Sequence, residues 1–388
     1  MKQIYLDYNA TTPLLEEVVD AMLPFLESSF GNPSSVHSFG RPAREAIENA
    51  RELFAKMINA DTSEIVFTSC GSESNNLALK GILYLTDEKT KKGHVITSTI
   101  EHPSILETCS HLESIGYPVT WLKVDGNGRI SIEELEKSIT DRTSLISIMY
   151  GNNEIGAIQD IPAIGAAAKK KGVVFHTDAV QVLGKVPVDV KKNNIDLLSV
   201  SAHKLYAPKG IGAIYIRKGL KMEALIHGGH QELSRRAGTE NVAGIVAFGK
   251  ACEIAMRDME AENRHLSKVK EKLKNGLITK IPKIRFNSPE SNCLPTTLNV
   301  GFLGVEGESI LINLDLKGVA VSTGSACSSG SVEPSHVLVA IGTPVEYSQS
   351  SLRFSFGRFT KEEDIDYVLE ILPPIVEKLR SMSPIWNG

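Results

Sequence analysis

Between residues 60 and 217 the sequence alternates short apolar segments with longer segments of helical spacing. Apolar runs such as residues 64–68, 94–97 and 195–200 are typical of buried strands. Two parallel strands need a long crossover between them, and the helical segments supply it. The alternation therefore predicts an α/β fold in which a mostly parallel sheet carries helices on both faces.

Two of the predicted strands end in residues that suit a cofactor site. Residues 195–200 run into Ser201-Ala-His-Lys204, and residues 172–177 run into Asp178. Ligands bind at the carboxyl ends of parallel strands. A pyridoxal phosphate site needs a lysine for the cofactor aldehyde and an acid for the pyridinium nitrogen. Alone, Lys204 suits a surface turn and Asp178 a helix N-cap, but together they favour this cofactor.

Other polar segments follow predicted strands on the same edge. Residues 69–76 (Ser-Cys-Gly-Ser-Glu-Ser-Asn-Asn) suit either a phosphate cradle at a helix N-terminus or an ordinary serine cap. His102 follows residues 94–97 and precedes Pro103, so it is either a structural histidine or a residue that stacks on a flat cofactor. The Gly- and Arg-rich segment 228–241 is either a solvated loop or an anion-binding or subunit-contact loop.

The last third of the chain mixes predicted strands and helices and indicates an α+β domain. It contains Gly324-Ser-Ala-Cys327-Ser-Ser, a cysteine among small polar residues that suits an exposed mobile loop and a thiolate nucleophile. A chance cysteine in a flexible loop is the alternative. Arg353, on a predicted strand, suits either a bidentate clamp on a substrate carboxylate or a surface ion pair.

Composition limits the class of protein. A net charge of -4 gives no reason to expect nucleic-acid or membrane binding. Apolar runs are too short for a membrane span, and the N-terminus lacks a signal-peptide pattern. The five cysteines are scattered without a CxxC pair, which argues against a disulfide framework or a zinc site. We therefore expect a cytoplasmic protein, without a bound metal.

These motifs together identify a family resemblance over almost the whole chain. The sequence resembles the NifS/IscS cysteine desulfurases, which belong to the aminotransferase-like pyridoxal phosphate enzymes. Gly229-His-Gln-Glu232 and the Ser383-Pro-Ile-Trp386 ending look closer to the NifS side. The other motifs are Tyr5-Leu-Asp-Tyr-Asn-Ala-Thr-Thr-Pro13, Gly31-Asn-Pro-Ser-Ser-Val-His37, Phe67-Thr-Ser-Cys-Gly-Ser-Glu-Ser74, Glu101-His-Pro103, Asn152-Asn-Glu-Ile-Gly156, His176-Thr-Asp-Ala-Val-Gln181, Ser201-Ala-His-Lys204, Arg236-Ala-Gly-Thr-Glu-Asn241, Gly324-Ser-Ala-Cys-Ser-Ser329 and Arg353-Phe-Ser355.

The resemblance implies the roles of the residues around the cofactor ring. Lys204 would hold pyridoxal 5'-phosphate as a Schiff base, and Asp178 would pair with its pyridinium nitrogen. Gln181 would hydrogen-bond the ring hydroxyl, with Asn153 nearby. His102 would stack on the ring and help to move protons.

The resemblance also implies a phosphate site formed by Gly71, Ser72, Ser201 and His203, joined by Thr239 from the other subunit of a homodimer. Many relatives carry Ala-Thr where this chain has Gly71-Ser72, and the serine hydroxyl predicts a changed contact.

For the substrate, the resemblance implies that Arg353 and Asn153 bind the carboxylate of L-cysteine. Cys327, on a mobile loop over residues 322–332, would attack the substrate sulfur.

The implied architecture is a large cofactor-binding domain over residues 13–255 with a seven-stranded type of sheet. A small domain of residues 1–12 and 256–388 would carry the cysteine loop. The implied activity converts L-cysteine to L-alanine and passes sulfur through a Cys327 persulfide to an iron–sulfur scaffold or another acceptor protein, with nitrogenase cluster assembly as one destination. A selenocysteine lyase and a pyridoxal phosphate aminotransferase remain alternatives, as does a cofactor-free thiol carrier.

Overall fold

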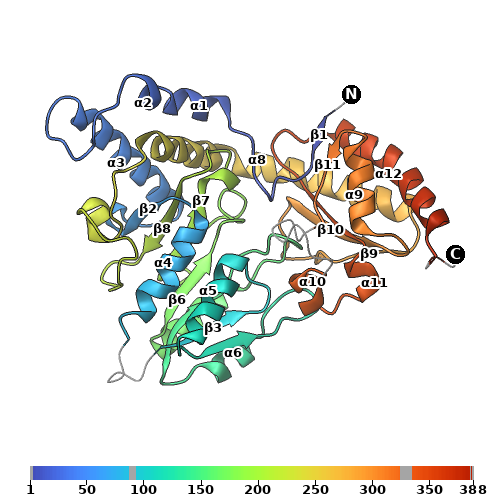
Figure 1. The fold of residues 1–388 in the computed structure, drawn as a ribbon, viewed down its shortest axis with the longest axis horizontal. Coiled ribbons are helices and arrows are strands. Elements are labelled where there is room, and N and C mark those ends of the chain that lie inside the picture. The colour runs from blue at the N-terminus through green and yellow to red at the C-terminus, as the bar shows by residue number, and fades with distance from the viewer. Residues whose placement is uncertain (1–2, 87–92, 324–333, 385, 387–388) are drawn as a thin grey trace.

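The computed structural model describes residues 3–86, 93–323, 334–384 and 386, and it divides into two packed parts (Figure 1). A seven-stranded sheet in the order β2-β8-β7-β6-β5-β3-β4 forms the centre of the larger part. The pairs within β7-β6-β5-β3-β4 are parallel, and β8 is antiparallel to both of its neighbours. The strands are β2 (Ile65–Thr68), β3 (His94–Ser98), β4 (Val119–Leu122), β5 (Thr143–Ser147), β6 (Val174–Asp178), β7 (Leu197–Ser201) and β8 (Gly212–Ile216). The predicted mostly parallel α/β sheet is confirmed.

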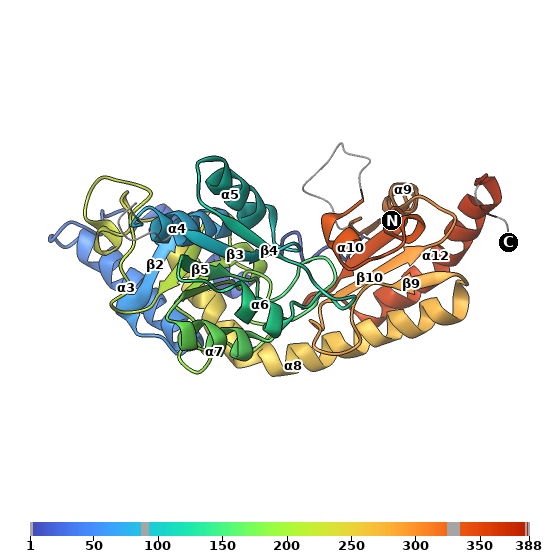
Figure 2. The ribbon, with the colours of Figure 1, turned by 90° about the horizontal axis from the view of Figure 1, so that it is seen from below.

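Helices cover both faces of this sheet because successive strand residues point to opposite sides. Val66, Val95 and Leu197 pack with α4 (Gly71–Leu83) and α5 (Pro103–Ser114). Their chain neighbours Phe67, Ile96 and Leu198 belong to a second buried cluster, on the side of α3, α7 and α8. The helices on that side are α3 (Gly40–Met57), α6 (Ile132–Ser138), α7 (Ile161–Lys171) and the first half of α8 (Val242–Lys280) (Figure 2).

The smaller part is built on two further sheets. One is antiparallel in the order β12-β10-β9, and the other is the parallel pair β1-β11. Its elements are β1 (Ile4–Tyr5), β9 (Ile284–Phe286), β10 (Thr297–Phe302), α9 (Gly307–Asp315), β11 (Val319–Ala320), α10 (His336–Ala340), α11 (Val345–Ser348), β12 (Ser351–Ser355) and α12 (Glu362–Met382). This is the α+β texture that the sequence predicts.

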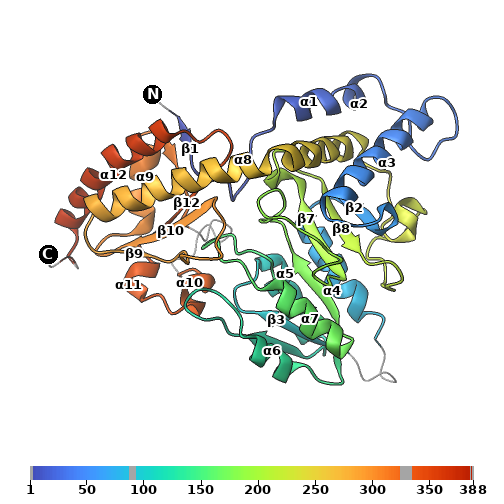
Figure 3. The same ribbon diagram turned by 180° about the vertical axis from the view of Figure 1, so that it is seen from behind.

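The helix α8 runs along both parts, as Figure 3 shows from behind. Its 39 residues extend about 58 Å at 1.5 Å per residue. Ala255 is buried in the core of the larger part, whereas Leu266 is buried in the core of the smaller part. The domain boundary at residues 255 and 256, with residues 1–12 in the small domain, stays a prediction.

The N-terminal helical segment is divided into α1 (Glu16–Met22) and α2 (Pro24–Glu27). Pro24 lacks a backbone N–H and so favours the first turn of a new helix. Short 3-10 turns complete the chain: η1 (Thr62–Glu64), η2 (Ala202–Lys204) and η3 (Gln231–Ser234). None of the helices in the described ranges combines the length and the apolar character that a membrane span requires.

Candidate active site

The carboxyl ends of the parallel strands bring the predicted residues to one edge of the sheet. Asp178 is the last residue of β6, and Lys204 ends the 3-10 turn that follows β7. His102 follows β3 as the N-cap of α5, and Gly71 begins α4 just after β2. The chain is therefore folded so that four strand ends supply one site.

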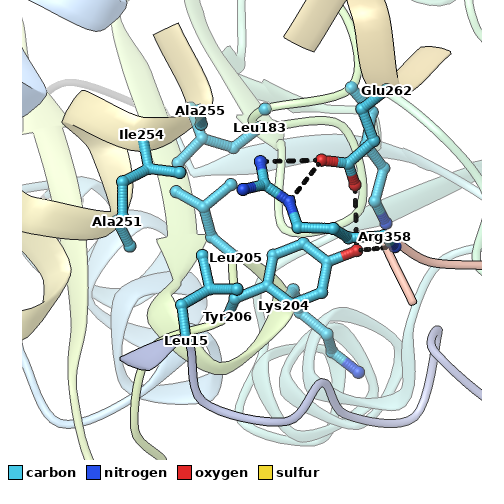
Figure 4. A pocket seen from close by; sticks show the side chains of 12 residues that line it. Leu15, Leu183, Lys204, Leu205, Tyr206, Ala251, Ile254, Ala255, Glu262 and Arg358 are labelled. Atoms are coloured by element: carbon cyan, nitrogen blue, oxygen red, sulfur yellow. Dashed lines mark hydrogen bonds and ion pairs between the residues drawn. The ribbon is translucent and has the colours of Figure 1, made fainter. Parts of the chain in front are cut away.

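Lys204 is held against the N-terminal segment. Its Nζ donates hydrogen bonds to the backbone carbonyl oxygens of Asn9 and, at 2.8 Å, Ala10. Figure 4 shows the side chain extending away from Glu262 and Arg358. The Lys204 amine is thus fixed beside the N-terminal segment at Asn9 and Ala10, while the Lys204 backbone lies in the turn that follows β7.

A small polar cluster lies on the other side of the Lys204 backbone, around a cavity of about 20 Å³ (Figure 4). The Tyr206 hydroxyl donates to Glu262 at 2.9 Å and accepts from the backbone N–H of Arg358 at 2.7 Å. The Arg358 Nε donates to the same carboxylate at 3.0 Å. This cluster ties the turn that carries Lys204 to α8 and to the segment after β12.

Asp178 is 6% exposed, and both of its carboxylate oxygens accept hydrogen bonds. Oδ2 accepts from Asn75 Nδ2 at 2.7 Å, and Oδ1 accepts from the backbone N–H of Val180 at 2.9 Å. These two donors fix the orientation of the carboxylate. A carboxylate at this place can pair with a protonated pyridine nitrogen.

His102 is joined to the same network through Ser104. Its Nδ1 lies 3.1 Å from the backbone nitrogen of Ser104 and 2.8 Å from the Ser104 Oγ. Asn75 Nδ2 donates to that Oγ at 2.8 Å. Burial lowers the pKa of His102, Asp178 opposes this, and the charges of Lys204 and His336 lower the pKa further.

Asn9 joins several of the remaining predicted residues. Its backbone oxygen accepts from Gln181 Nε2 at 3.0 Å as well as from Lys204. Its Nδ2 donates to the backbone oxygen of Asn153 at 2.9 Å and to Thr297 Oγ1 at 2.8 Å. Asn9 therefore links the predicted ring-binding residues to β10 of the smaller part.

Arg353 reaches the same place from β12 and is 3% exposed. Its Nη1 donates to the Asn153 carbonyl at 3.1 Å, and its Nη2 forms an ion pair with Asp7 at 2.7 Å. The Nε atom is buried without a hydrogen-bond partner in the described part of the chain. A carboxylate that reaches this guanidinium would satisfy the orphaned donor.

The residues predicted to hold a phosphate are partly assembled. Gly71 and Ser72 begin α4, where backbone N–H groups and the helix dipole favour an anion. A Cβ at Gly71 would lie 2.9 Å from Val180 Cγ2 and 3.4 Å from Ser201 Cβ, so glycine keeps this approach open. Burial and the charge of Lys204 lower the pKa of His203 to about 4. Thr239 is exposed and is not among the residues that these contacts join.

The residues present fit pyridoxal phosphate. The amine and the carboxylate that its ring needs follow the neighbouring strands β7 and β6, the imidazole follows β3 at the same edge of the sheet, and the N-terminus of α4 lies beside Ser201. The orphaned Arg353 Nε is a ready donor for a substrate carboxylate. Among the described residues, the His, Cys, Asp and Glu side chains form no cluster that could hold a metal ion.

Cys327 lies outside the described residues, as does most of the predicted loop 322–332. The residues that flank it are placed beside the site. Ser322 exchanges backbone hydrogen bonds with Arg353, and Ser335 donates from its hydroxyl to the buried Glu154.

Sequence reasoning missed three residues that make direct contacts here. Asn9 and Asn75 lie inside recognised motifs, but asparagine after a strand equally suits a turn, so neither was distinguished. Lys185 donates to Gln181 Oε1 at 3.3 Å. Burial, with smaller effects from Lys204 and Arg353, lowers the pKa of Lys185 to about 7. The only indication in the sequence was that Lys185 follows Gln181 by four residues, a spacing at which two side chains can contact each other.

Comparisons with a family model, with curated relatives and with solved structures all indicate the same family. The model of the family "Aminotransferase class-V" matches residues 4–368. The cysteine desulfurase IscS of Dictyoglomus turgidum is 52% identical over 383 residues, which cover 99% of this chain and 97% of the relative. A solved NifS-like protein is 38% identical with a TM-score of 0.92, covering 97% of this chain and all of the other. SspA solved in complex with cysteine is 40% identical with a TM-score of 0.82, covering 92% of this chain and all of SspA.

Proposed function

The chain belongs to the class-V aminotransferase family, within which its relatives are cysteine desulfurases, and from this premise we propose that it is a pyridoxal phosphate enzyme that converts L-cysteine to L-alanine. The observation that carries the proposal is the placement of Lys204 and Asp178 on neighbouring strand ends, β7 and β6, in a chain that matches desulfurases over its full length. A cysteine complex of a relative supports the substrate.

One group of residues would hold the ring of the cofactor, and a second group would hold its phosphate. Lys204 would bind its aldehyde carbon, Asp178 its ring nitrogen, Gln181 and Asn153 its ring hydroxyl side, and His102 one face of the ring. The phosphate would be held by Gly71, Ser72, Ser201, His203 and Thr239, the last from a second copy of the chain. When bound, the cofactor supplies an electron sink for charge that develops at the substrate Cα.

Arg353 and the turn around Asn153 would bind the substrate carboxylate. The guanidinium is already oriented by Asp7 and by the Asn153 carbonyl, which leaves Nε to donate to the incoming oxygen. Because the guanidinium is planar and its other donors are already engaged, the Nε contact fixes the direction of the substrate as well as meeting its charge.

Lys204 would act as the base that takes the Cα proton of the substrate. The carbonyl oxygens of Asn9 and Ala10 keep its amine close to the site through hydrogen bonds.

Cys327 would attack the sulfur of the substrate as a thiolate. A new S–S bond forms, the substrate C–S bond breaks, and its electron pair returns to the carbon skeleton, which takes up a proton to become alanine. The persulfide on Cys327 then passes its outer sulfur to an acceptor protein, such as an iron–sulfur scaffold. A reducing, cytoplasmic compartment suits this free thiol.

The test is product analysis with a matched variant. Purified protein with L-cysteine and a thiol reductant is expected to release alanine and sulfide in equal amounts. Cys327→Ala is expected to lose both products while keeping the cofactor absorbance band. Similar rates from both proteins would refute Cys327 as the nucleophile and would favour lyase or aminotransferase chemistry at the same Lys204.

A further inference from the structure

A continuous chain of hydrogen bonds joins Asp178, on β6, to the ring of His102, the N-cap of α5. Asp178 Oδ2 lies 2.7 Å from Asn75 Nδ2, which lies 2.8 Å from Ser104 Oγ, which lies 2.8 Å from His102 Nδ1. Asn75, in the middle of this link, is 1% exposed, whereas Ser104 and His102 are partly buried. At the buried Asn75 amide nitrogen, water cannot replace a missing partner, so its two hydrogens are directed at Asp178 and Ser104.

The direction of these hydrogen bonds follows from Asp178. An ionised carboxylate only accepts, so the Asn75 atom facing it is the amide nitrogen. The opposite orientation would set the Asn75 oxygen against the carboxylate. The two hydrogens of that nitrogen serve Asp178 and Ser104. Ser104 Oγ therefore accepts from Asn75, and its own hydrogen is available for His102 Nδ1.

A second donor reaches the same ring nitrogen. The backbone N–H of Ser104 points at His102 Nδ1 over 3.1 Å, because His102 is the N-cap of α5. A backbone N–H cannot reverse its role. Two donors thus meet at Nδ1, and a proton on that atom would oppose both of them.

We infer that His102 is a neutral imidazole with its proton on Nε2, and that Asn75 and Ser104 are positioning residues that fix this tautomer. The tautomer follows from the hydrogen bonds alone; its meaning for the reaction rests on the proposed function. Nε2–H can donate a hydrogen bond, but it has no lone pair with which to accept a proton. His102 in the free enzyme is therefore a stacking and hydrogen-bond-donating residue, and proton removal falls to the Lys204 amine.

Taken together, the surroundings of His102 lower its pKa. Burial lowers its pKa, and Lys204 and His336 add to this, while Asp178 on the far side of the network raises it. The His336 ring faces the backbone oxygen of Glu101 at 3.0 Å. A neutral His102 is thus consistent with the groups that pack against it from β6, η2 and α10.

The test is nitrogen NMR of the histidine side chains in the full-length protein loaded with cofactor and without substrate. The chain has 10 histidines, and His102→Gln assigns the signals of this ring. We expect Nδ1 to show the shift of an unprotonated nitrogen and Nε2 that of a protonated one at neutral pH. A proton on Nδ1, or a doubly protonated ring at neutral pH, would overturn the inference. Because no turnover is measured, this outcome is independent of the desulfurase activity.

Variants of Ser104 separate the tautomer effect from loosening of the helix. Ser104→Ala removes one donor to the neutral ring, so the pKa of His102 is expected to rise by about half to one unit, the equivalent of one modest hydrogen bond. Ser104→Thr keeps the hydroxyl and is expected to restore the parent value. Thr108→Ala removes a hydrogen bond to the Ser104 carbonyl without touching the ring, and it is expected to change nothing. Equal shifts in the Ser104→Ala and Thr108→Ala proteins would refute the positioning role.

Discussion

Replacing Arg353 by lysine tests how the site recognises its substrate. Lysine keeps the positive charge beside Asp7, so the ion pair that is buried on β12 survives in part. Its compact ammonium cannot keep the contacts to Asp7 and Asn153 and also reproduce the Nε donor, so the substrate carboxylate loses one charge-assisted hydrogen bond. Such a bond contributes about 1.5–3 kcal/mol, which corresponds to a loss of about ten- to 150-fold in kcat/KM for L-cysteine.

Steady-state kinetics with alanine as the measured product would test this expectation. The absorbance of the bound cofactor and the unfolding midpoint serve to show that the Arg353→Lys protein is folded and loaded. Asp7→Asn is the matched control: it weakens the competing ion pair, which frees the guanidinium, so KM is expected to stay the same or fall. If Arg353→Lys keeps the parent kcat/KM, the assignment of Arg353 to the substrate carboxylate is wrong.

Three further predictions concern stability and are checked by urea unfolding. Burial raises the pKa of Glu101 to about 8, so folding loses stability as pH rises from about 4.5 to 8, and Glu101→Gln is expected to flatten that decline. The pKa of Lys185 is lowered to about 7, so its ammonium form opposes folding, and the free energy of unfolding is expected to fall as pH falls from about 10.5 to 7. Lys185→Met is expected to remove this loss. If the free energy of unfolding of Lys185→Met depends on pH in that range as the parent's does, the prediction is wrong. Glu232→Ala leaves the buried Arg51 without its two 2.8 Å partners and is expected to cost about 3–5 kcal/mol, whereas a change near zero would show that the pair contributes little.

The alternation of apolar and helical segments was sufficient to predict the sheet. Strands such as β5 and β7 are buried on both faces and are continuously apolar or small in sequence, which is the pattern of a parallel sheet. The direction of β8 was not predictable in the same way. Its apolar run, residues 212–216, does not indicate whether the strand pairs with β7 in the antiparallel or the parallel direction, and the structure shows antiparallel pairing.

The part of the site that could be predicted consists of residues whose type and position in the sequence are unusual. Lys204 and Asp178 stand out because a lysine and an acid end apolar strands. Asn9 acts through its backbone oxygen, which any residue possesses, so its role became visible only with coordinates. Asn75 lies 103 positions from Asp178 in the chain, and no local pattern indicates that they touch.

The tautomer of His102 shows the same limit. The sequence marks a histidine before a proline at a helix start, and this motif suits either a cap or a proton-transfer group. The structure shows that the cap contact uses Nδ1 and so decides which nitrogen can carry the proton. Local helix geometry thus restricts the chemistry of a residue in a way that residue type alone does not.

The most direct test of the central claim is mass spectrometry of the protein after a single exposure to L-cysteine without added reductant. The account predicts one extra sulfur atom on the peptide that contains Cys327, alanine in an equal amount, and loss of the added sulfur when a thiol reductant is supplied. Alanine formed without any sulfur on Cys327, or sulfur found only on Cys70, Cys109, Cys252 or Cys293, would contradict it.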